Sequence, residues 1–168
     1  PEAKVGISKD ITLVQDYFKK LFDIDYVKTD GSQFDYLFKD GERLEIDSLK
    51  ITIISTPGHT PACVSYLIND SLFTGDALFM PDFGTGRCDF PKGSSLDLYH
   101  SIKDKIYKLS DEIKIYTGHD YQPNGRELKF LSTIKEEKST NIQINETTTK
   151  DEFIKFRNDR DKTLNAPR

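Results

Sequence analysis

The pattern of apolar and polar positions, read with helix-capping residues, predicts four helices. They cover residues 10–22, residues 94 to about 109, residues 125–138, and residues 150 to about 162. The first has one apolar stripe, which consists of Ile11, Val14, Phe18, Leu21 and Phe22. Ser8 is the predicted cap of that helix, Ser94 or Ser95 that of the second, and Thr149-Lys150-Asp151-Glu152 is a capping box for the last.

Short runs rich in β-branched residues predict strands between these helices. The strands cover residues 44–46, 50–55, 63–68, 72–74 and 113–116. Turn dipeptides separate several of the runs, namely Asp30-Gly31, Asp40-Gly41 and Asn69-Asp70. Residues 79–93 show neither the helical nor the strand period of apolar positions, and they are rich in Gly and Pro. A long irregular segment within a compact domain is usually functional.

Three of the predicted strands end in a glycine followed by a residue that can bind a metal. The sequences are Gly58-His59, Gly75-Asp76 and Gly118-His119. Neutral imidazole and carboxylate are ligands of hard and borderline divalent metals. One such histidine alone usually caps a strand, and one such aspartate usually makes a turn. Because the pattern occurs three times, we predict a metal site at these strand ends.

At these residues the chain resembles a known family. The segments Thr56 to Pro61, Phe73 to Leu78, Gly86 to Phe90 and Gly118 to Tyr121 are similar to the metallo-β-lactamase superfamily. Gly-Arg-Cys-Asp-Phe, Leu98 to Ser101 and His-Asp-Tyr more narrowly resemble its persulfide (sulfur) dioxygenase branch, with the bacterial β-lactamase-like hydrolases. The resemblance implies an α/β fold, the αβ/βα sandwich, in a single domain over residues 1–168 with a helical tail from about 141.

The chain departs from that family in one respect. The His-x-His-x-Asp-His motif is absent, since the only histidines are His59, His100 and His119. We expect the motif to lie before Pro1, so that this chain is the C-terminal portion of a fold that is incomplete at its N-terminus and inactive alone. A naturally shortened, metal-poor homologue is the alternative.

The resemblance implies one Fe(II) per chain, held by two histidines and one aspartate. His59 and Asp76 match two of these ligands, and the third would belong to the absent motif. Such a triad leaves three positions open. The implied reaction is oxidation of a thiol persulfide, such as glutathione persulfide, by O₂ to sulfite and thiol. A glyoxalase-II-like thioester hydrolase with two metals, such as Zn(II), is the first alternative, and a metal-free fragment or binding module is the second.

The resemblance also suggests roles for neighbouring residues. His119 and Tyr121 are candidate catalytic residues, and His119 would become a ligand if a second metal were present. Arg87 and Thr60 are candidate substrate-binding residues, because a guanidinium suits a carboxylate of the thiol carrier. The alternatives are a structural ion pair of Arg87 with Asp89 or Asp82, and a buried structural role for Tyr121.

Three further residue types have simpler interpretations. Asp120 either fixes the tautomer of a ligand histidine or is a turn residue, and the two interpretations stay open. Cys63 and Cys88 are expected to be small buried residues. His100 falls on a predicted helix, away from the site.

Composition and charge narrow the function classes. The 168 residues carry a net charge of −4, from 24 basic and 28 acidic side chains, which argues against nucleic acid and anionic membranes as partners. No apolar run reaches the roughly 20 residues of a membrane span. Two cysteines make no disulfide framework, which favours a reducing, cytoplasmic location. A homodimer is left open.

Overall fold

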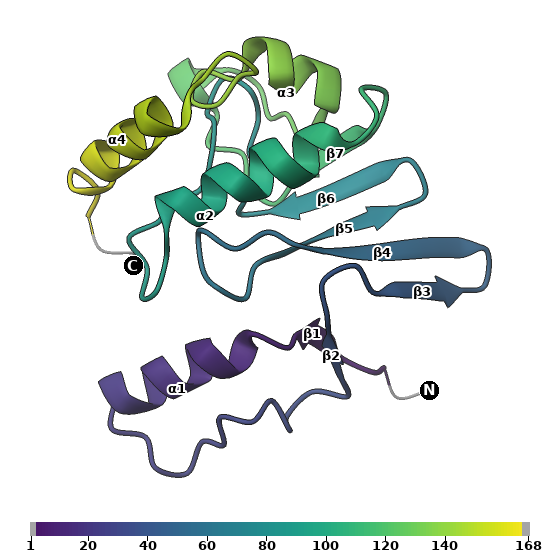
Figure 1. Cartoon of the computed structure of the whole chain (residues 1–168), viewed down its shortest axis with the longest axis vertical. Helices are drawn as coiled ribbons and strands as arrows, with labels where there is room; N and C mark the ends of the chain where they lie inside the picture. The colour runs from purple at the N-terminus through teal and green to yellow at the C-terminus, as the bar shows by residue number, and fades with distance from the viewer. Residues whose placement is uncertain (1–2, 166–168) are drawn as a thin grey trace.

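A six-stranded sheet carries the centre of the fold (Figure 1). Its strands lie in the order β3 (Arg43–Ile46), β4 (Leu49–Ser55), β5 (Val64–Ile68), β6 (Ser71–Gly75), β7 (Lys114–Thr117) and β8 (Leu131–Thr133). Within this six-stranded sheet, β6 and β7 are the one pair of neighbours that run in parallel. It follows that β4, β6 and β7 run in one direction and end at the same edge of the sheet. The computed structural model that gives these bounds describes residues 3–165.

Helices cover one face of this sheet. α2 (Ser95–His100) continues through a π-helical turn, η1 (Ser101–Lys105), into a 3₁₀ turn, η2 (Ile106–Lys108). α4 (Lys150–Asp161) packs against α2, and α3 (Ile134–Thr140) follows β8. A further 3₁₀ turn, η3, spans Pro123–Gly125. No helix within residues 3–165 is both long and apolar enough to cross a membrane.

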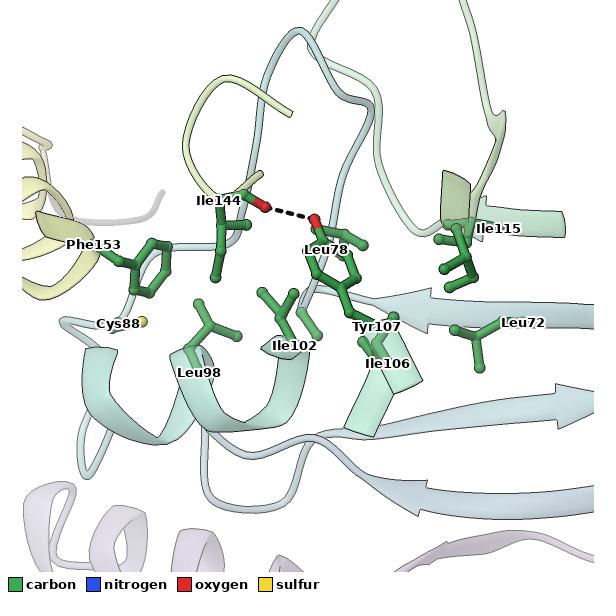
Figure 2. Close-up of a cluster of buried hydrophobic side chains, with 12 residues drawn as sticks. Leu72, Leu78, Cys88, Leu98, Ile102, Ile106, Tyr107, Ile115, Ile144 and Phe153 are labelled. Atoms are coloured by element: carbon green, nitrogen blue, oxygen red, sulfur yellow. Dashed lines mark hydrogen bonds between the residues drawn. The ribbon is translucent and has the colours of Figure 1, made fainter. Parts of the chain in front are cut away.

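The core lies between the sheet and these helices (Figure 2). Leu72 of β6 and Ile115 of β7 belong to one buried cluster with a row from the helical run, which consists of Leu98, Ile102 and Ile106. Phe153 of α4 closes one end of the core. The Tyr107 hydroxyl donates to the Ile144 carbonyl at 2.6 Å, which ties the segment before α4 to the same core.

A smaller unit precedes the sheet. β1 (Gly6–Ser8) and β2 (Tyr36–Phe38) form a parallel pair, with α1 (Ile11–Leu21) between them in the chain. α1 is amphipathic as predicted, but none of its residues is fully buried, and Leu21 is 55% exposed. The strands β1 and β2 were not predicted from sequence, because each is three residues long and depends on a partner about 30 positions away.

Most predicted elements are confirmed, and two predictions are wrong. The helix predicted at residues 125–138 is replaced by irregular chain, β8 and then α3, because residues 131–133 pair with β7 and leave only the last part free to be helical. Ser8 does not cap α1: Asp10 is the residue before the helix, and Ser8 Oγ accepts a hydrogen bond from the Asp10 amide. Ser94 caps α2, and the capping box at Thr149 and Glu152 is present.

Candidate metal centre

His59, Asp76 and His119 come together at the sheet edge where β4, β6 and β7 end. His59 Nε2 lies 3.6 Å from Asp76 Oδ2, and His119 Nε2 lies 3.3 Å from Asp76 Oδ1. Asp76 Oδ1 is buried and has no hydrogen-bond partner within residues 3–165. A buried, unpartnered carboxylate oxygen is costly unless something else satisfies it.

A metal ion fits this arrangement in part. Two imidazole nitrogens face the two oxygens of one carboxylate, and this donor set suits Fe(II) or Zn(II). Among the described residues, however, no three His, Cys, Asp or Glu side chains are grouped closely enough to hold an ion by themselves. His59 and Asp76 can therefore supply only part of a metal centre, which would need further ligands to complete it.

Two glycines allow the backbone to form this site. Gly75 has φ +54°, a left-handed conformation that turns the chain between β6 and Asp76. Gly86 passes directly over the Asp76 backbone, so a Cβ at Gly86 would lie 2.0 Å from the Asp76 carbonyl oxygen. The irregular segment predicted to be functional is therefore packed onto the site through Gly86.

The backbone of this segment also fixes the tautomer of His59. His59 Nδ1 lies 2.7 Å from the Arg87 carbonyl oxygen. Because a carbonyl can only accept, Nδ1 carries the proton and Nε2 presents its lone pair toward Asp76. The Phe90 ring packs against the imidazole, with ring centres 4.6 Å apart. Sequence analysis missed this contact, because a backbone carbonyl has no residue-type signal.

The side chain of Arg87 is used within the protein. Its guanidinium forms a bidentate ion pair with Asp89 and donates to the Asn165 carbonyl at 2.9 Å. The hydrogen bonds from Arg87 lower the pKa of the Asp89 carboxyl. The structure thus favours the alternative interpretation of Arg87, a structural pair with Asp89, over the substrate anchor. The other suggested partner, Asp82, pairs with Arg126 instead.

Asp120 organises a loop and does not touch a histidine ring. Both its oxygens accept from Arg126, at 2.7 and 2.8 Å, and the Lys129 amide donates to it at 2.8 Å. Chiefly because of the hydrogen bonds from Arg126, the pKa of Asp120 falls to about 2. Arg126 also binds Asp82, so it joins the loop after β7 to the loop after β6. The tautomer-fixing interpretation of Asp120 is wrong.

Aromatic rings line the cavity beside the three candidate ligands, and its volume is about 490 Å³. The Tyr121 and Phe83 rings stack with centres 4.4 Å apart. Tyr121 is 56% exposed, so the buried structural interpretation does not hold. Thr60 is not among the lining residues, and its hydroxyl lies 3.1 Å from Cys63 Sγ. The substrate-binding prediction for Thr60 therefore lacks structural support.

The two cysteines are free thiols; Cys88 is buried as expected, whereas Cys63 is only partly buried. Burial raises the pKa of Cys88 to about 12. A thiol with that pKa is a poor nucleophile at neutral pH. His100 is half exposed on α2 and forms a 2.7 Å contact with Asp104.

Sequence analysis missed two cavity residues, Arg157 and Arg160 of α4. Arg157 is buried and pairs with Asp161 at 2.6 Å. The other oxygen of Asp161 accepts from the Cys88 amide at 2.8 Å, so this pair also supports the Gly86 to Phe90 segment. Arginines on a mostly polar helix give no sign that they face a site whose residues lie 38 to 101 positions earlier in the chain.

Comparison with known proteins gives a family-model match and similar curated proteins. The model described as "Metallo-beta-lactamase superfamily" matches residues 5–119. "Glyoxylase B2" of Dictyostelium discoideum is 53% identical over 99% of this chain and 58% of its own length. The human "Persulfide dioxygenase ETHE1, mitochondrial" is 37% identical over 75% of this chain and 47% of its own length.

A solved structure shares the fold over nearly the whole chain. The crystal structure of ETHE1 from Myxococcus xanthus matches with a TM-score of 0.68 and 26% identity, over 97% of this chain and 80% of that one. The chain thus spans about half the length of the curated relatives it matches, 58% and 47% for the two above.

Proposed function

The chain belongs to the metallo-beta-lactamase superfamily, and on this premise we propose that it forms part of an iron-dependent persulfide dioxygenase. The reaction converts RSSH, O₂ and water into RSH, sulfite and two protons. The persulfide loses four electrons and O₂ gains them, so no other oxidant is required. The superfamily relatives with 53% and 37% identity are named for different reactions, which is why the specific reaction is a proposal.

One observation carries the proposal: the hydrogen bond from His59 Nδ1 to the Arg87 carbonyl. Pro-Gly-His-Thr is common to the superfamily, whereas Gly-Arg-Cys-Asp-Phe resembles the dioxygenase branch. This contact connects the two motifs, since the Arg87 carbonyl of the Gly-Arg-Cys-Asp-Phe segment orients His59, the candidate ligand. The structural similarity to the Myxococcus xanthus protein over 97% of the chain supports the same assignment.

Each residue of the site would have its own role in this reaction. His59 and Asp76 would hold Fe(II) together with ligands from outside residues 3–165. Iron, when bound, supplies the electron transfer that links persulfide oxidation to O₂ reduction. The Tyr121 hydroxyl makes no hydrogen bond within the described residues, so it is free to donate to the substrate sulfur. His119 Nε2, at the same edge, can take up a proton released by the persulfide.

A dinuclear thioester hydrolase is the second candidate, and one observation favours it. The two Asp76 oxygens face different imidazoles, Oδ2 toward His59 and Oδ1 toward His119. A carboxylate placed this way could bridge two metals that activate a water molecule. The similarity to the protein named glyoxylase B2 agrees with this alternative.

The proposed function is tested with the intact protein and two histidine variants. His59→Ala should lose both bound iron, measured by elemental analysis, and persulfide-dependent O₂ uptake, measured with an oxygen electrode. His100→Ala is the matched control, since the half-exposed His100 lies on α2 beside Asp104 and Tyr99 and does not line the cavity, and it should keep both. If His59→Ala retains iron and O₂ uptake, His59 is not a ligand and the proposal is wrong.

A further inference from the structure

Three arginines line the cavity, and their side chains differ in how they are used. Arg87 is paired with Asp89, and Arg157 is paired with Asp161. Arg160 forms no ion pair and no side-chain hydrogen bond within residues 3–165. The neighbouring acidic residue, Asp159, forms ion pairs with Lys155 and Lys162, at 2.8 and 3.2 Å. Arg160 is therefore the cavity's uncompensated arginine.

Arg160 is held in place without using its hydrogen-bond donors. Its guanidinium lies over the Phe83 ring, with Cζ 5.6 Å from the ring centre. Stacking on an aromatic face orients a guanidinium while its N–H groups stay available, because a ring face offers no oxygen acceptor. A half-buried guanidinium with free donors is suited to bidentate binding of a carboxylate.

A row of aromatic rings connects Arg160 with the candidate metal centre. Arg160 lies 5.6 Å from Phe83, Phe83 stacks on Tyr121 at 4.4 Å, and the Tyr121 and His119 ring centres are 6.1 Å apart. An extended tripeptide spans about 10 Å, and Arg160 and Asp76 line the same cavity. A peptide-sized thiol could thus place its sulfur near Asp76 and a carboxylate at Arg160.

We propose that Arg160 binds a carboxylate of the thiol carrier and so selects acidic, peptide-sized thiols over neutral ones. The identity of the carrier as a thiol rests on the proposed function. In this account α4 supplies the specificity, and the sheet edge supplies the chemistry. Arg160 takes the role that sequence analysis gave to Arg87, whose guanidinium is already neutralised by Asp89.

The experiment uses the intact, metal-loaded protein and two probes, the persulfides of glutathione and of glutathione diethyl ester. In the wild type, KM should be lower for the acid than for the ester. Arg160→Gln should raise KM for the acid about 10- to 100-fold, the range of charged hydrogen bonds. It should leave KM for the ester and both kcat values within about threefold. Arg160→Lys should show a smaller increase.

Lys162→Gln is the matched control. It removes the same charge from the end of α4, and Lys162 does not line this cavity. It should behave as the wild type with both probes. If Arg160→Gln also behaves as the wild type while O₂ uptake persists, the inference is overturned and the proposed function stands.

A calorimetric titration separates the two claims if no persulfide supports O₂ uptake. Glutathione and its diethyl ester are each titrated into wild type and Arg160→Gln, with no turnover required. If Arg160→Gln binds glutathione more weakly than the wild type does, and binds the diethyl ester equally well, the carboxylate site at Arg160 is supported even though the dioxygenase proposal has failed. Equal binding of both ligands by both proteins ends the inference. Equal melting temperatures show that the variant is folded.

Discussion

At the scale of single residues, the centre depends on close backbone contacts more than on side-chain partners. His59 is oriented by one carbonyl oxygen, that of Arg87. That carbonyl is in position because Gly86 lies against the Asp76 backbone with no room for a Cβ. The imidazole and the carboxylate are thereby aligned before any ligand arrives, which reduces the free energy needed to organise them on binding.

Gly86→Ala tests this contact. The added Cβ would meet the Asp76 carbonyl oxygen at 2.0 Å, so the segment must move away and carry the Arg87 carbonyl with it. We expect iron affinity to fall about 10- to 100-fold, as for loss of partners that orient ligands, and unfolding free energy to fall by about 1–3 kcal/mol. Iron affinity is measured by competition with a chelator.

Gly41→Ala is the control for Gly86→Ala. Gly41 has φ +75° and no atom within 4 Å of a Cβ at this position, so the variant suffers only backbone strain of roughly 1–2 kcal/mol. Its iron affinity should stay that of the wild type. Equal iron affinities in the two glycine variants would show that the Gly86 contact does not organise the site.

The same residues show how far sequence reasoning reaches. His59, Asp76 and His119 were identified as candidates for the metal site because the ligand type and the strand end can both be read from the local sequence. Arg87 was assigned a substrate role, whereas the structure pairs its guanidinium with Asp89, because sequence cannot tell which of several acids an arginine will pair with. Arg160 was missed since its place in the cavity depends on how α4 packs, which no local pattern encodes.

At the scale of elements, loops and helix ends are joined by buried polar groups. Arg126 links the loop after β6 with the loop after β7, through Asp82 and Asp120. Glu137 of α3 is fully buried, and accepts from Ser132 at 2.6 Å and from Asn141 at 2.8 Å. Helix prediction failed at residues 125–138 because the β7–β8 pairing, with the long-range Arg126–Asp82 contact, overrides local propensity.

Arg126→Gln should destabilise the protein strongly. The side chain of Asp120 is only 3% exposed, and without Arg126 it keeps the Lys129 amide hydrogen bond but loses its cationic partner. Loss of the charged hydrogen bonds to Asp82 and Asp120 should lower the unfolding free energy, measured in urea, by more than the loss of an exposed charge. Lys129→Gln removes one charge from the same loop, where the Lys129 side chain is exposed, and should cost under about 0.5 kcal/mol. Similar losses in both variants would contradict the buried-pair account.

Glu137 predicts how stability depends on pH. Burial raises the pKa of its carboxyl from 4.5 to about 7, against smaller opposing effects of the Asn141 and Ser132 hydrogen bonds. Because the folded state holds the Glu137 proton more tightly than the unfolded state, the protonated carboxyl stabilises the fold. This stabilisation is fully present below pH 4.5 and is lost as pH rises to about 7. One pKa unit equals about 1.4 kcal/mol, so the loss is roughly 3 kcal/mol.

Glu137→Gln should remove this slope. Relative to the variant, the wild type should lose about 3 kcal/mol of unfolding free energy between pH 4.5 and pH 7, followed by urea unfolding at several pH values. Glu136→Gln is the control, since Glu136 is the exposed neighbour, and it should keep the slope. An unchanged slope in Glu137→Gln would show that Glu137 does not hold a proton at these pH values.

At the scale of the whole molecule, the chain provides a sheet edge, an aromatic cavity and a helix that closes one side of it. Among residues 3–165, no three metal-binding side chains are grouped closely enough to hold an ion by themselves, and the chain spans about half the length of its curated relatives. The fold was predictable from sequence because its motifs resemble one superfamily. The reaction was not predictable in the same way, since relatives that match the chain are named for different reactions.

The most direct test of the account is a comparison of two substrates with one preparation of the intact protein. Glutathione persulfide is supplied in air, with O₂ uptake and sulfite release measured together, and a glutathione thioester is supplied without air, with thiol release measured. We predict one O₂ consumed per sulfite released, and no thioester cleavage. Rapid anaerobic thioester cleavage without persulfide-dependent O₂ uptake would contradict the dioxygenase assignment and favour the dinuclear hydrolase.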